Sequence, residues 1–455
     1  MLRFHMRSAH QASVLLSSLG ATLESAPDGL GRTARDRIDP EWIEQAIASG
    51  GSIEVRRRKM PARVVVWLVI GICLFAGMSF PDVVRRFGLT LPTKRGRAQL
   101  DPTSGSIAEA RKRLGGEAMK RLFEITSEHW RRLPEFEQLT FKGLQVCAID
   151  GVNFRVPDTP SNREQFGRPP NVDAGYPATM GVCVIDVITH MIIAATFGSS
   201  RDGEVTHLRR LASDLPGRAV YLLDRNFNSF ADLYDVQDAD TDRHWLVRAK
   251  RHMRVHLVRE LGPGDALVEA RAHSRLRRRV PDLPRSFVVR RLEFSKNDKT
   301  YVVLTSLLDP VRFPAADVAA LYTSRWEIEL VFDDIKTEQR ERVVALRSKS
   351  PDLVYQELYG LLVAHNLVRI EMAHAATLLG VAPTRISFHR ALTVVEREFG
   401  FFAGDPPTKL WERHEALYEK LKYLLLPPRR KRSYPRAVKQ RPAKYKKAEE
   451  NCASS

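Results

Sequence analysis

Cysteine is scarce in this sequence, with four in 455 residues: Cys73, Cys147, Cys183 and Cys452. No two of them are separated by two residues, and no histidines stand at the spacings of a zinc site. A disulfide framework and a structural zinc site are therefore both unsupported, which fits a reducing cytoplasm. Three of the cysteines lie in apolar runs, where we expect buried thiols.

Long uncharged stretches are also scarce, because only Val64–Phe80 stays uncharged for 17 residues. That length is the lower limit for a membrane-spanning helix, and basic residues precede the run as they would on the inner side of a membrane. Glycines interrupt it, however, and Pro81 follows. We expect a buried core helix and no membrane contact, with a membrane-anchored protein as the alternative. The first 20 residues lack the apolar region and cleavage site of a signal peptide.

Acidic residues are outnumbered, with 54 Asp and Glu against 72 Lys and Arg and a formal net charge of +18. A basic surface concentrates polyanions and speeds their capture, so nucleic acid is the favoured partner. A basic protein without such a partner is the alternative. Hydrophobic residues make up 44% of the chain, so most of it should fold, and its length predicts two to four domains.

The apolar patterns predict helices first and an α/β layer afterwards. Asp39 and Pro40 begin the first helix as N-cap and first-turn proline, and Gly50 ends it. Further helices are expected over 61–78, 81–87, 106–114 and 117–132. Short strands and helices alternate from about 144, strands alone follow over 244–306, a long helix spans 314 to 340, and more helices cover 351–400.

Two short segments concentrate basic side chains. The helix expected over 106–114 carries Arg111 and Arg113, and short basic helices suit a DNA groove, although a solvated charged face is equally consistent. Residues 427–455 contain ten Lys or Arg against two Glu. Such a run is typical of a solvated, disordered tail and is also suited to nonspecific phosphate binding.

Asp150 and Asp224 each directly follow an apolar run that predicts a strand. Acidic residues are poor strand formers, and a carboxylate beside a buried strand needs a partner for its charge. In one α/β layer the two can lie side by side, where they raise each other's pKa unless a cation sits among them. Hard oxygen ligands favour Mg²⁺ or Mn²⁺. Asp158 and Asp186 are interpreted as turn residues instead.

A third carboxylate, Glu329, comes from the helix expected over 314–340. Arg325, Glu329 and Lys336 follow Tyr322 by 3, 7 and 14 residues. At about 100° per residue, these four lie within roughly 60° of one another on the helix surface. An ordinary ion pair between Arg325 and Glu329 explains the same spacing and is favoured when this helix is considered alone.

These residues resemble the signature of a known family. The spacing Y-(2)-R-(3)-E-(6)-K looks like that of the insertion-sequence-four family of DDE transposases, where DDE denotes the two aspartates and the glutamate. The segment 150–167 resembles the first aspartate block of that family and 224–227 the second, with Asn226 where the family usually has Gly. Asn tolerates left-handed backbone geometry, so this departure matters little. The resemblance covers most of residues 25–440.

The resemblance implies an RNase H-like catalytic core of α/β class with a β-rich insertion before the glutamate. Asp150, Asp224 and Glu329 would bind two divalent metal ions, Mg²⁺ or Mn²⁺. The reaction would be cleavage of transposon-end phosphodiesters, followed by strand transfer of the 3′-hydroxyl into target DNA. The residues expected to hold phosphates near the cut end are Tyr322, Arg325 and Lys336.

The implied partner is double-stranded DNA, both transposon ends and target, and no membrane. A homodimer is expected on DNA because two ends must be brought together, and the cytoplasm is the expected location. The predicted segments are a loose start (1–38), a helical DNA-end-binding domain (39–135), the catalytic domain (140–242 and 310–400), a β-rich insertion (243–309), a C-terminal helix (401–426) and the basic tail (427–455).

Two other functions share these features. A different metal-dependent nuclease of the RNase H fold, such as a junction resolvase, would use the same carboxylates without strand transfer. A decayed transposase copy would bind DNA without cutting it, although the three intact carboxylates argue against decay.

Overall fold

A computed structural model gives the structure of the protein over sixteen stretches of the chain. They are 37–50, 60–86, 90–93, 96–99, 102–133, 139–169, 175–237, 241–250, 253, 255–272, 274–280, 283–296, 299–340, 345–401, 419–421 and 423–427. Met1–Leu425 forms one compact unit and Leu426–Ser455 a second. Most of the predicted loose start and C-terminal helix, and nearly all of the predicted basic tail, lie outside the described residues.

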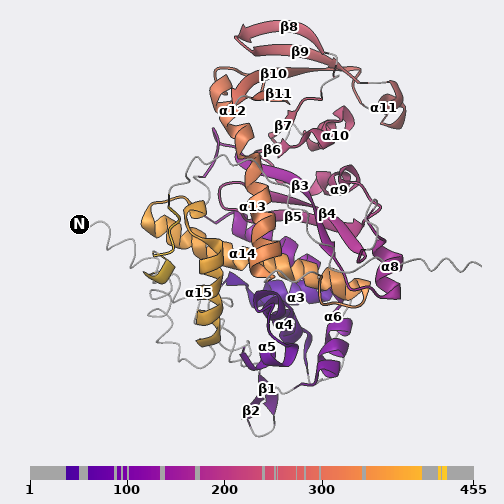
Figure 1. The fold of residues 1–455 in the computed structure, drawn as a ribbon, viewed down its shortest axis with the longest axis vertical. Coiled ribbons are helices and arrows are strands. Elements are labelled where there is room, and N and C mark those ends of the chain that lie inside the picture. Colours follow the sequence, from indigo (N-terminus) through magenta and orange to yellow (C-terminus); the bar gives the residue numbers. More distant parts are fainter. Residues whose placement is uncertain are drawn as a thin grey trace, which may run out of the picture. The chain divides into compact units, whose positions relative to one another are not determined.

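A nine-stranded sheet runs through the first unit, with the strand order β5-β4-β3-β6-β7-β11-β10-β9-β8 (Figure 1). On one side of it β3, β4 and β5 are antiparallel neighbours, and β6 and β7 run parallel to β3. The bounds are β3 (Gln145–Arg155), β4 (Ala178–Asp186), β5 (Ile192–Ser199), β6 (Ala219–Leu223) and β7 (Arg243–Arg248).

The remaining four strands form an antiparallel extension of the same sheet. They are β8 (Val255–Gly262), β9 (Asp265–Arg271), β10 (Ser286–Lys296) and β11 (Lys299–Thr305), with the short helix α11 (Ser274–Arg279) between β9 and β10. The sequence predicted these strands but not α11. Because β11 pairs with β7, the extension continues the hydrogen-bonded ladder of the central strands.

Strand β3 is longer than the sequence predicted. Asp150 was expected to end it, but the strand continues to Arg155, and Asp150 pairs with Cys183 in its interior. The reason is the alternating pattern after Asp150, where Val152 and Phe154 are buried between more exposed neighbours. This pattern keeps one face of the strand in the core on both sides of the carboxylate.

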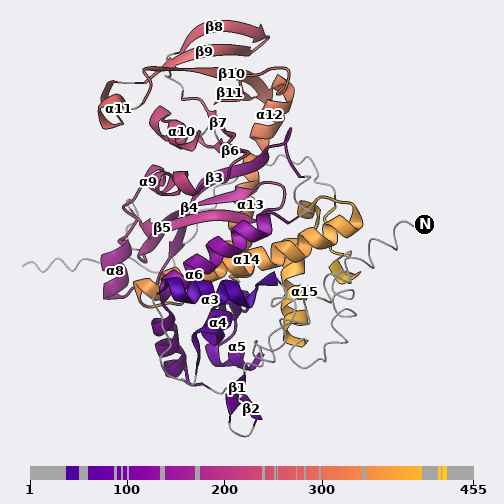
Figure 2. The ribbon, with the colours of Figure 1, turned by 180° about the vertical axis from the view of Figure 1, so that it is seen from behind.

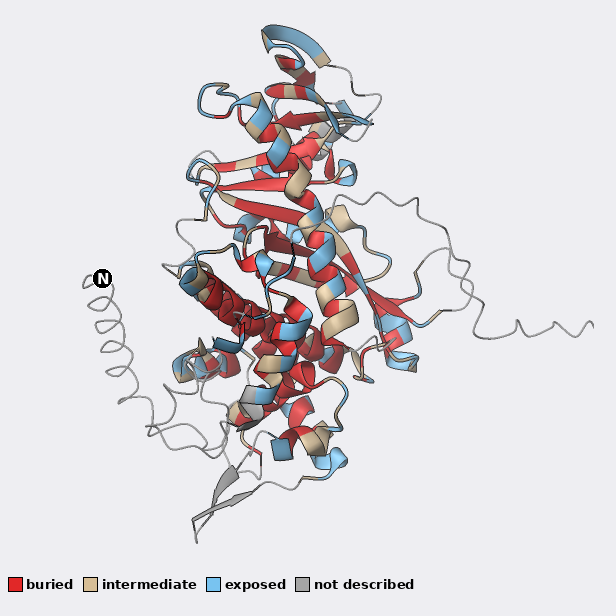
Figure 3. Cartoon of the chain, turned by 60° about the vertical axis from the view of Figure 1, so that its left-hand side comes forward, coloured by how far each residue is buried: buried red, intermediate tan, exposed pale blue. Residues whose placement is uncertain are grey.

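Helices cover both faces of the central strands. On one face, α9 (Glu204–Leu211), α10 (Phe230–Val236) and the 3₁₀ turn η1 (Ala212–Asp214) share a core with the strands. On the other lie α14 (Pro351–Leu379) and α6 (Ser104–Arg131). Figure 3 shows that α14 is buried along almost all of its length. Such double coverage explains why β4 is buried at every position.

The N-terminal helices are α3 (Pro40–Ser49), α4 (Ala62–Leu74), α5 (Phe80–Arg86) and α6. As predicted, the Asp39 side chain caps α3 by accepting a hydrogen bond from Glu41 N at 2.8 Å. Helix α6 bends at Gly115, whose φ of 76° lies in the region that favours glycine.

Between α5 and α6, β1 (Thr90–Thr93) and β2 (Gly96–Gln99) form an antiparallel hairpin where the sequence predicted no strands. Pro92 is incompatible with a helix interior there.

Helix α4 is the predicted core helix. It ends at Leu74, four residues earlier than expected, and every residue from Val64 to Leu74 is buried. No helix in the described stretches has both the length and the apolarity needed to cross a membrane. Figure 2 shows α4 below α14, and a Cβ added at Gly360 of α14 would lie 2.6 Å from Val69. Glycine at that position allows the two helices to approach closely.

The long helix predicted over 314–340 is a chain of four helical segments. They are α12 (Ala315–Thr323), the 3₁₀ turn η3 (Ser324–Trp326), α13 (Glu327–Asp333) and the π-helical η4 (Asp334–Gln339). The remaining elements are α8 (Pro160–Phe166), the 3₁₀ turns η2 (Arg225–Phe227) and η5 (Pro383–Arg385), and α15 (Phe388–Phe401).

Candidate active site

The sheet register brings Asp150 and Asp224 together. In the parallel pair of β3 and β6, Ile149 is the partner of Leu223, so the next residues of the two strands are Asp150 and Asp224. The charge of Asp224 acts on Asp150, where it contributes to raising the pKa. The expectation that the two aspartates lie side by side therefore agrees with the geometry.

Asp150 is half-buried and bonds to two groups, one in its own strand and one in the turn η3 that precedes α13. Its Oδ1 accepts a hydrogen bond from Gly151 N at 2.8 Å, and Arg325 Nη1 donates to Oδ2 at 3.4 Å. Burial raises the pKa of Asp150, while the Gly151 hydrogen bond and the Arg325 charge oppose that rise. In this structure the cation that compensates Asp150 is an arginine side chain.

Arg325 is held in place by aromatic neighbours. It is buried in the turn η3, and its guanidinium carbon lies 5.0 Å from the centre of the Trp326 ring. Tyr322 is buried beside it, and that burial raises the pKa of the phenol to about 12, so it remains a neutral hydrogen-bonding group. Arg325 Nε is buried and makes no hydrogen bond among the described residues.

Glu329 is exposed on α13, and α13 lies against β3. The sequence-based alternative was a local ion pair between Glu329 and Arg325, whereas the structure shows Arg325 bonded to Asp150. Lys336 follows in the π-helical turn, with Nζ 5.8 Å from the ring of Phe154 and 5.6 Å from that of Phe332. Burial lowers the pKa of Lys336.

A third carboxylate that the sequence analysis did not select lies near the two aspartates. Glu204 begins α9, and its pKa is raised first by burial and then by the charges of Asp150 and Asp224. No strand end or family block marks this residue. A signal was available in Gly151, because a glycine directly after a buried carboxylate indicates a close approach to the backbone.

Within the described stretches, no three His, Cys, Asp or Glu side chains are arranged closely enough to hold a metal ion. The chemistry of the donors nevertheless fits a hard divalent cation. Asp150, Asp224 and Glu204 offer carboxylate oxygens, the donor type that Mg²⁺ and Mn²⁺ prefer, and a bound cation would relieve the repulsion between their charges. Glu329 is an exposed carboxylate of α13, the helix that contacts β3.

The two arginines predicted to contact DNA from α6 are placed differently. Arg113 is exposed. Arg111 is only 2% exposed, and its guanidinium donates to Gln356 Oε1 at 2.8 Å and to Ser348 Oγ at 2.9 Å. This placement corrects the prediction that Arg111 contacts DNA, because its donors are used inside the protein.

Asp186 is a turn residue, as predicted. It ends β4, and its Oδ1 accepts hydrogen bonds from Ile188 N at 2.9 Å and Thr189 N at 2.8 Å. These bonds satisfy the carboxylate within the hairpin that leads to β5.

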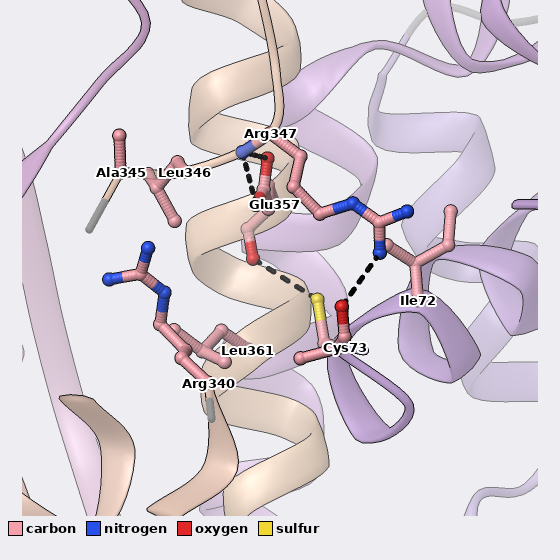
Figure 4. A pocket seen from close by; sticks show the side chains of 9 residues that line it. Ile72, Cys73, Arg340, Ala345, Leu346, Arg347, Glu357 and Leu361 are labelled. Carbon is pink, nitrogen blue, oxygen red and sulfur yellow. Dashed lines mark hydrogen bonds between the residues drawn. The ribbon is translucent and has the colours of Figure 1, made fainter. Parts of the chain in front are cut away.

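Figure 4 shows a small pocket between α4, α14 and the end of η4. Glu357 accepts hydrogen bonds there from the backbone N–H of Arg347, and the Cys73 thiol donates to the Glu357 carbonyl at 3.5 Å. The cavity measures about 20 Å³, which is room for a single water molecule. It is a buried polar junction between helices and not a substrate site.

Two family models match the chain. Residues 31–124 match the N-terminal region described as "Insertion element 4 transposase N-terminal", and residues 141–367 match "Transposase DDE domain". The second match includes Asp150, Asp224 and Glu329.

Two curated proteins of Escherichia coli (strain K12) are similar to the chain. Transposase InsG for insertion sequence element IS4 is 33% identical over 413 residues, which are 90% of this chain and 92% of that protein. Putative transposase InsZ is 27% identical over 230 residues, which are 50% of this chain and 74% of that protein.

Among solved structures, the piggyBac transposase synaptic complex with hairpin DNA aligns with 86% of this chain and 84% of its own, at a TM-score of 0.41 and 12% identity. The identity and coverage with InsG, together with the family-model matches, establish the family. This chain belongs to the insertion element 4 family of DDE transposases, enzymes that cleave and move DNA.

Proposed function

We propose that Asp150, Asp224 and Glu329 hold the divalent metal ions of this transposase, and that these are two Mg²⁺ or Mn²⁺ ions. The observation that carries the proposal is the register of β3 and β6, which puts Asp150 and Asp224 at adjacent positions. Helix α13 against β3 supports Glu329 as the third ligand. Bound metal ions would activate the attacking hydroxyl and stabilise the leaving oxygen at phosphorus.

The predicted phosphate-binding residues of α12, η3 and η4 would bind the DNA backbone. Arg325 Nη1 lies 3.4 Å from Asp150 Oδ2, so the guanidinium is suited to a phosphate oxygen beside the metal site. Buried Tyr322 would orient Arg325, and Lys336 would supply a point charge. Arg113 on α6 would add a contact away from the cut.

We further propose that the catalytic core is RNase H-like. The strand order β5-β4-β3-β6-β7, with three antiparallel strands followed by two parallel to β3, supports this assignment. The boundaries 39–135 for DNA-end binding, 140–242 with 310–400 for catalysis and 243–309 for the insertion are part of the same proposal. So are a cytoplasmic location and a homodimer on DNA, since one reaction must join two ends.

The test is cleavage of DNA that carries the ends of the element, with Mg²⁺ and the full chain. Asp150→Asn, Asp224→Asn and Glu329→Gln should each abolish end cleavage and strand transfer while leaving end binding in a gel shift largely intact. Losing one metal-held carboxylate removes about 10³-fold or more of the rate, on the scale of the electrostatic stabilisation that such sites supply.

Asp158→Asn is the matched control, since Asp158 belongs to the same sequence block but is exposed and paired with Arg163. It should cleave like the wild type. Full cleavage by any of the three site variants would remove that residue from the site, and end binding without cleavage by the wild type would indicate a decayed copy.

A further inference from the structure

Glu204 reaches the catalytic aspartates from the opposite side of the sheet to α13. It is the first residue of α9, which follows β5 and packs on β4, β5 and the turn η2 that carries Asn226. The side chain is half-buried, and among the described residues no cation forms an ion pair with it. A half-buried carboxylate without a cationic partner needs another source of positive charge.

Gly151 is the residue that makes this approach possible. A Cβ built at Gly151 would lie 2.3 Å from Glu204 Oε1 and 2.8 Å from both Cδ and Cγ, so any side chain there would displace the glutamate. The backbone of Gly151 has no positive φ that would require glycine for its own geometry. The absence of a side chain at 151 is therefore explained by the Glu204 side chain lying over the strand, one residue from Asp150.

Asn226 lies on the same side of the site as the second aspartate, because it stands two residues after Asp224 in the turn η2 that α9 packs against. The Asn226 side chain is close enough to Glu204 to oppose the rise in the pKa of that carboxyl. The charges of Asp150 and Asp224 both raise the pKa of Glu204, so the three carboxylates lie within electrostatic range of one another. A glutamate in the first turn of a helix is also stabilised by the helix dipole, but the dipole does not explain why the side chain lies over Gly151.

We propose that Glu204 is a fourth carboxylate of the metal site, that it contacts a divalent ion held by Asp150 and Asp224, and that Asn226 positions it. The proposal rests on the function proposed above for the two aspartates. The proposal explains three observations: position 151 has no side chain, the Asn226 side chain lies near Glu204, and no cation among the described residues forms an ion pair with Glu204. It also assigns α9, which carries none of the three predicted catalytic residues, to the catalytic site.

The first experiment measures Mn²⁺ binding to the full chain by titration calorimetry, without DNA. Glu204→Gln should weaken Mn²⁺ binding by about 10-fold or more, on the scale seen when groups around a metal are changed. Glu164→Gln, an exposed glutamate of the short helix α8, is the matched control and should bind like the wild type. In metal-free buffer Glu204→Gln should melt at the same or a higher temperature, because it removes one of three repelling charges.

Asp150→Asn separates the two proposals. If Asp150→Asn loses Mn²⁺ binding while Glu204→Gln binds it like the wild type, the aspartate site stands and the role of Glu204 is overturned. If Asp150→Asn also binds Mn²⁺ normally, the proposed metal site itself fails, and the role of Glu204 with it.

A second experiment tests the link between Gly151 and Glu204. Gly151→Ala should reduce Mn²⁺ affinity in the wild-type background, because the new methyl group displaces the glutamate. In a Glu204→Ala background the same change should have no further effect, since the space is already empty. If Gly151→Ala reduced Mn²⁺ affinity equally in both backgrounds, its effect would not depend on Glu204. That result would overturn the proposed contact.

Discussion

Arg111 and Arg113 lie two residues apart on α6, and helical geometry turns their side chains in different directions. Arg111 points into the protein, where Gln356 and Ser348 accept its hydrogen bonds. Burial lowers the pKa of Arg111, and the charge of Glu357 opposes that fall. Arg113 is exposed. One basic cluster in the sequence therefore contains a structural residue and a candidate DNA contact.

Arg111→Ala should lower the free energy of unfolding by about 3 kcal/mol, because it leaves buried acceptors and a buried carboxylate without their cation. Arg113→Ala should change it by less than about 0.5 kcal/mol, as exposed substitutions usually do, and should weaken DNA binding at low salt. Urea unfolding and gel shifts measure the two effects. Equal stability of the two variants would contradict the assigned roles.

The sequence predicts those site residues whose signal is local. Asp150 and Asp224 stand after apolar runs, and the spacing of Tyr322, Arg325 and Glu329 is a pattern within one helical segment. The burial of Arg111 depends on acceptors more than 230 residues away, and the place of Glu204 depends on a contact across the sheet. The Arg111 contacts leave no periodic or spaced signal in the chain, and Gly151 indicates a close approach without indicating that Glu204 makes it.

The helical stretch from α12 to η4 shows how partners from elsewhere in the chain determine the geometry of an element. Periodicity predicted its extent, but not its change from 3₁₀ to α and then to π geometry between Ser324 and Gln339. Asp334 begins the π-helical turn and forms an ion pair with Arg369 of α14, which is almost wholly buried. Burial raises the pKa of Asp334 to about 6, and the charge of Arg369 opposes that rise. Partners from a distant helix therefore help to shape the turn that carries Lys336.

Asp334→Asn should destabilise the protein by about 3–5 kcal/mol, because Arg369 would remain buried without a counter-charge. The double variant Asp334→Leu, Arg369→Met should recover most of that loss, since two apolar side chains replace two buried charges. Denaturant unfolding of the wild type, both single variants and the double variant measures the coupling. Losses that simply add would show that the pair does not stabilise this turn.

At the scale of the whole molecule, one hydrophobic core joins segments that lie far apart in the sequence. It includes Ile38 and Leu421, residues of α4 and α6, one face of β3 and most of α14. Local patterns predicted the helices and strands themselves. They could not predict that α4 and α6 pack on α14, or that β7 pairs with β11, because these pairings are set by tertiary contacts.

The shared core predicts that the N-terminal helices and the catalytic strands unfold together. Calorimetry of the full chain should show one main transition covering both. A chain that begins after residue 133 should be insoluble or unfolded, because α14 would expose the apolar surface that α4 and α6 cover. A soluble, cooperatively folding truncated chain would show instead that the helices form an independent domain.

The packing of α4 on α14 also has a consequence for synthesis. About 280 residues separate the two helices along the chain, and ribosomes add about 5–20 residues per second, so α4 leaves the ribosome roughly 14–55 seconds before its partner exists. During that interval its 13 residues, apolar except for Arg63, have no surface to bury against on α14. Each newly made chain therefore passes through a period in which chaperone binding competes with aggregation, and the rate of translation determines how long that period lasts.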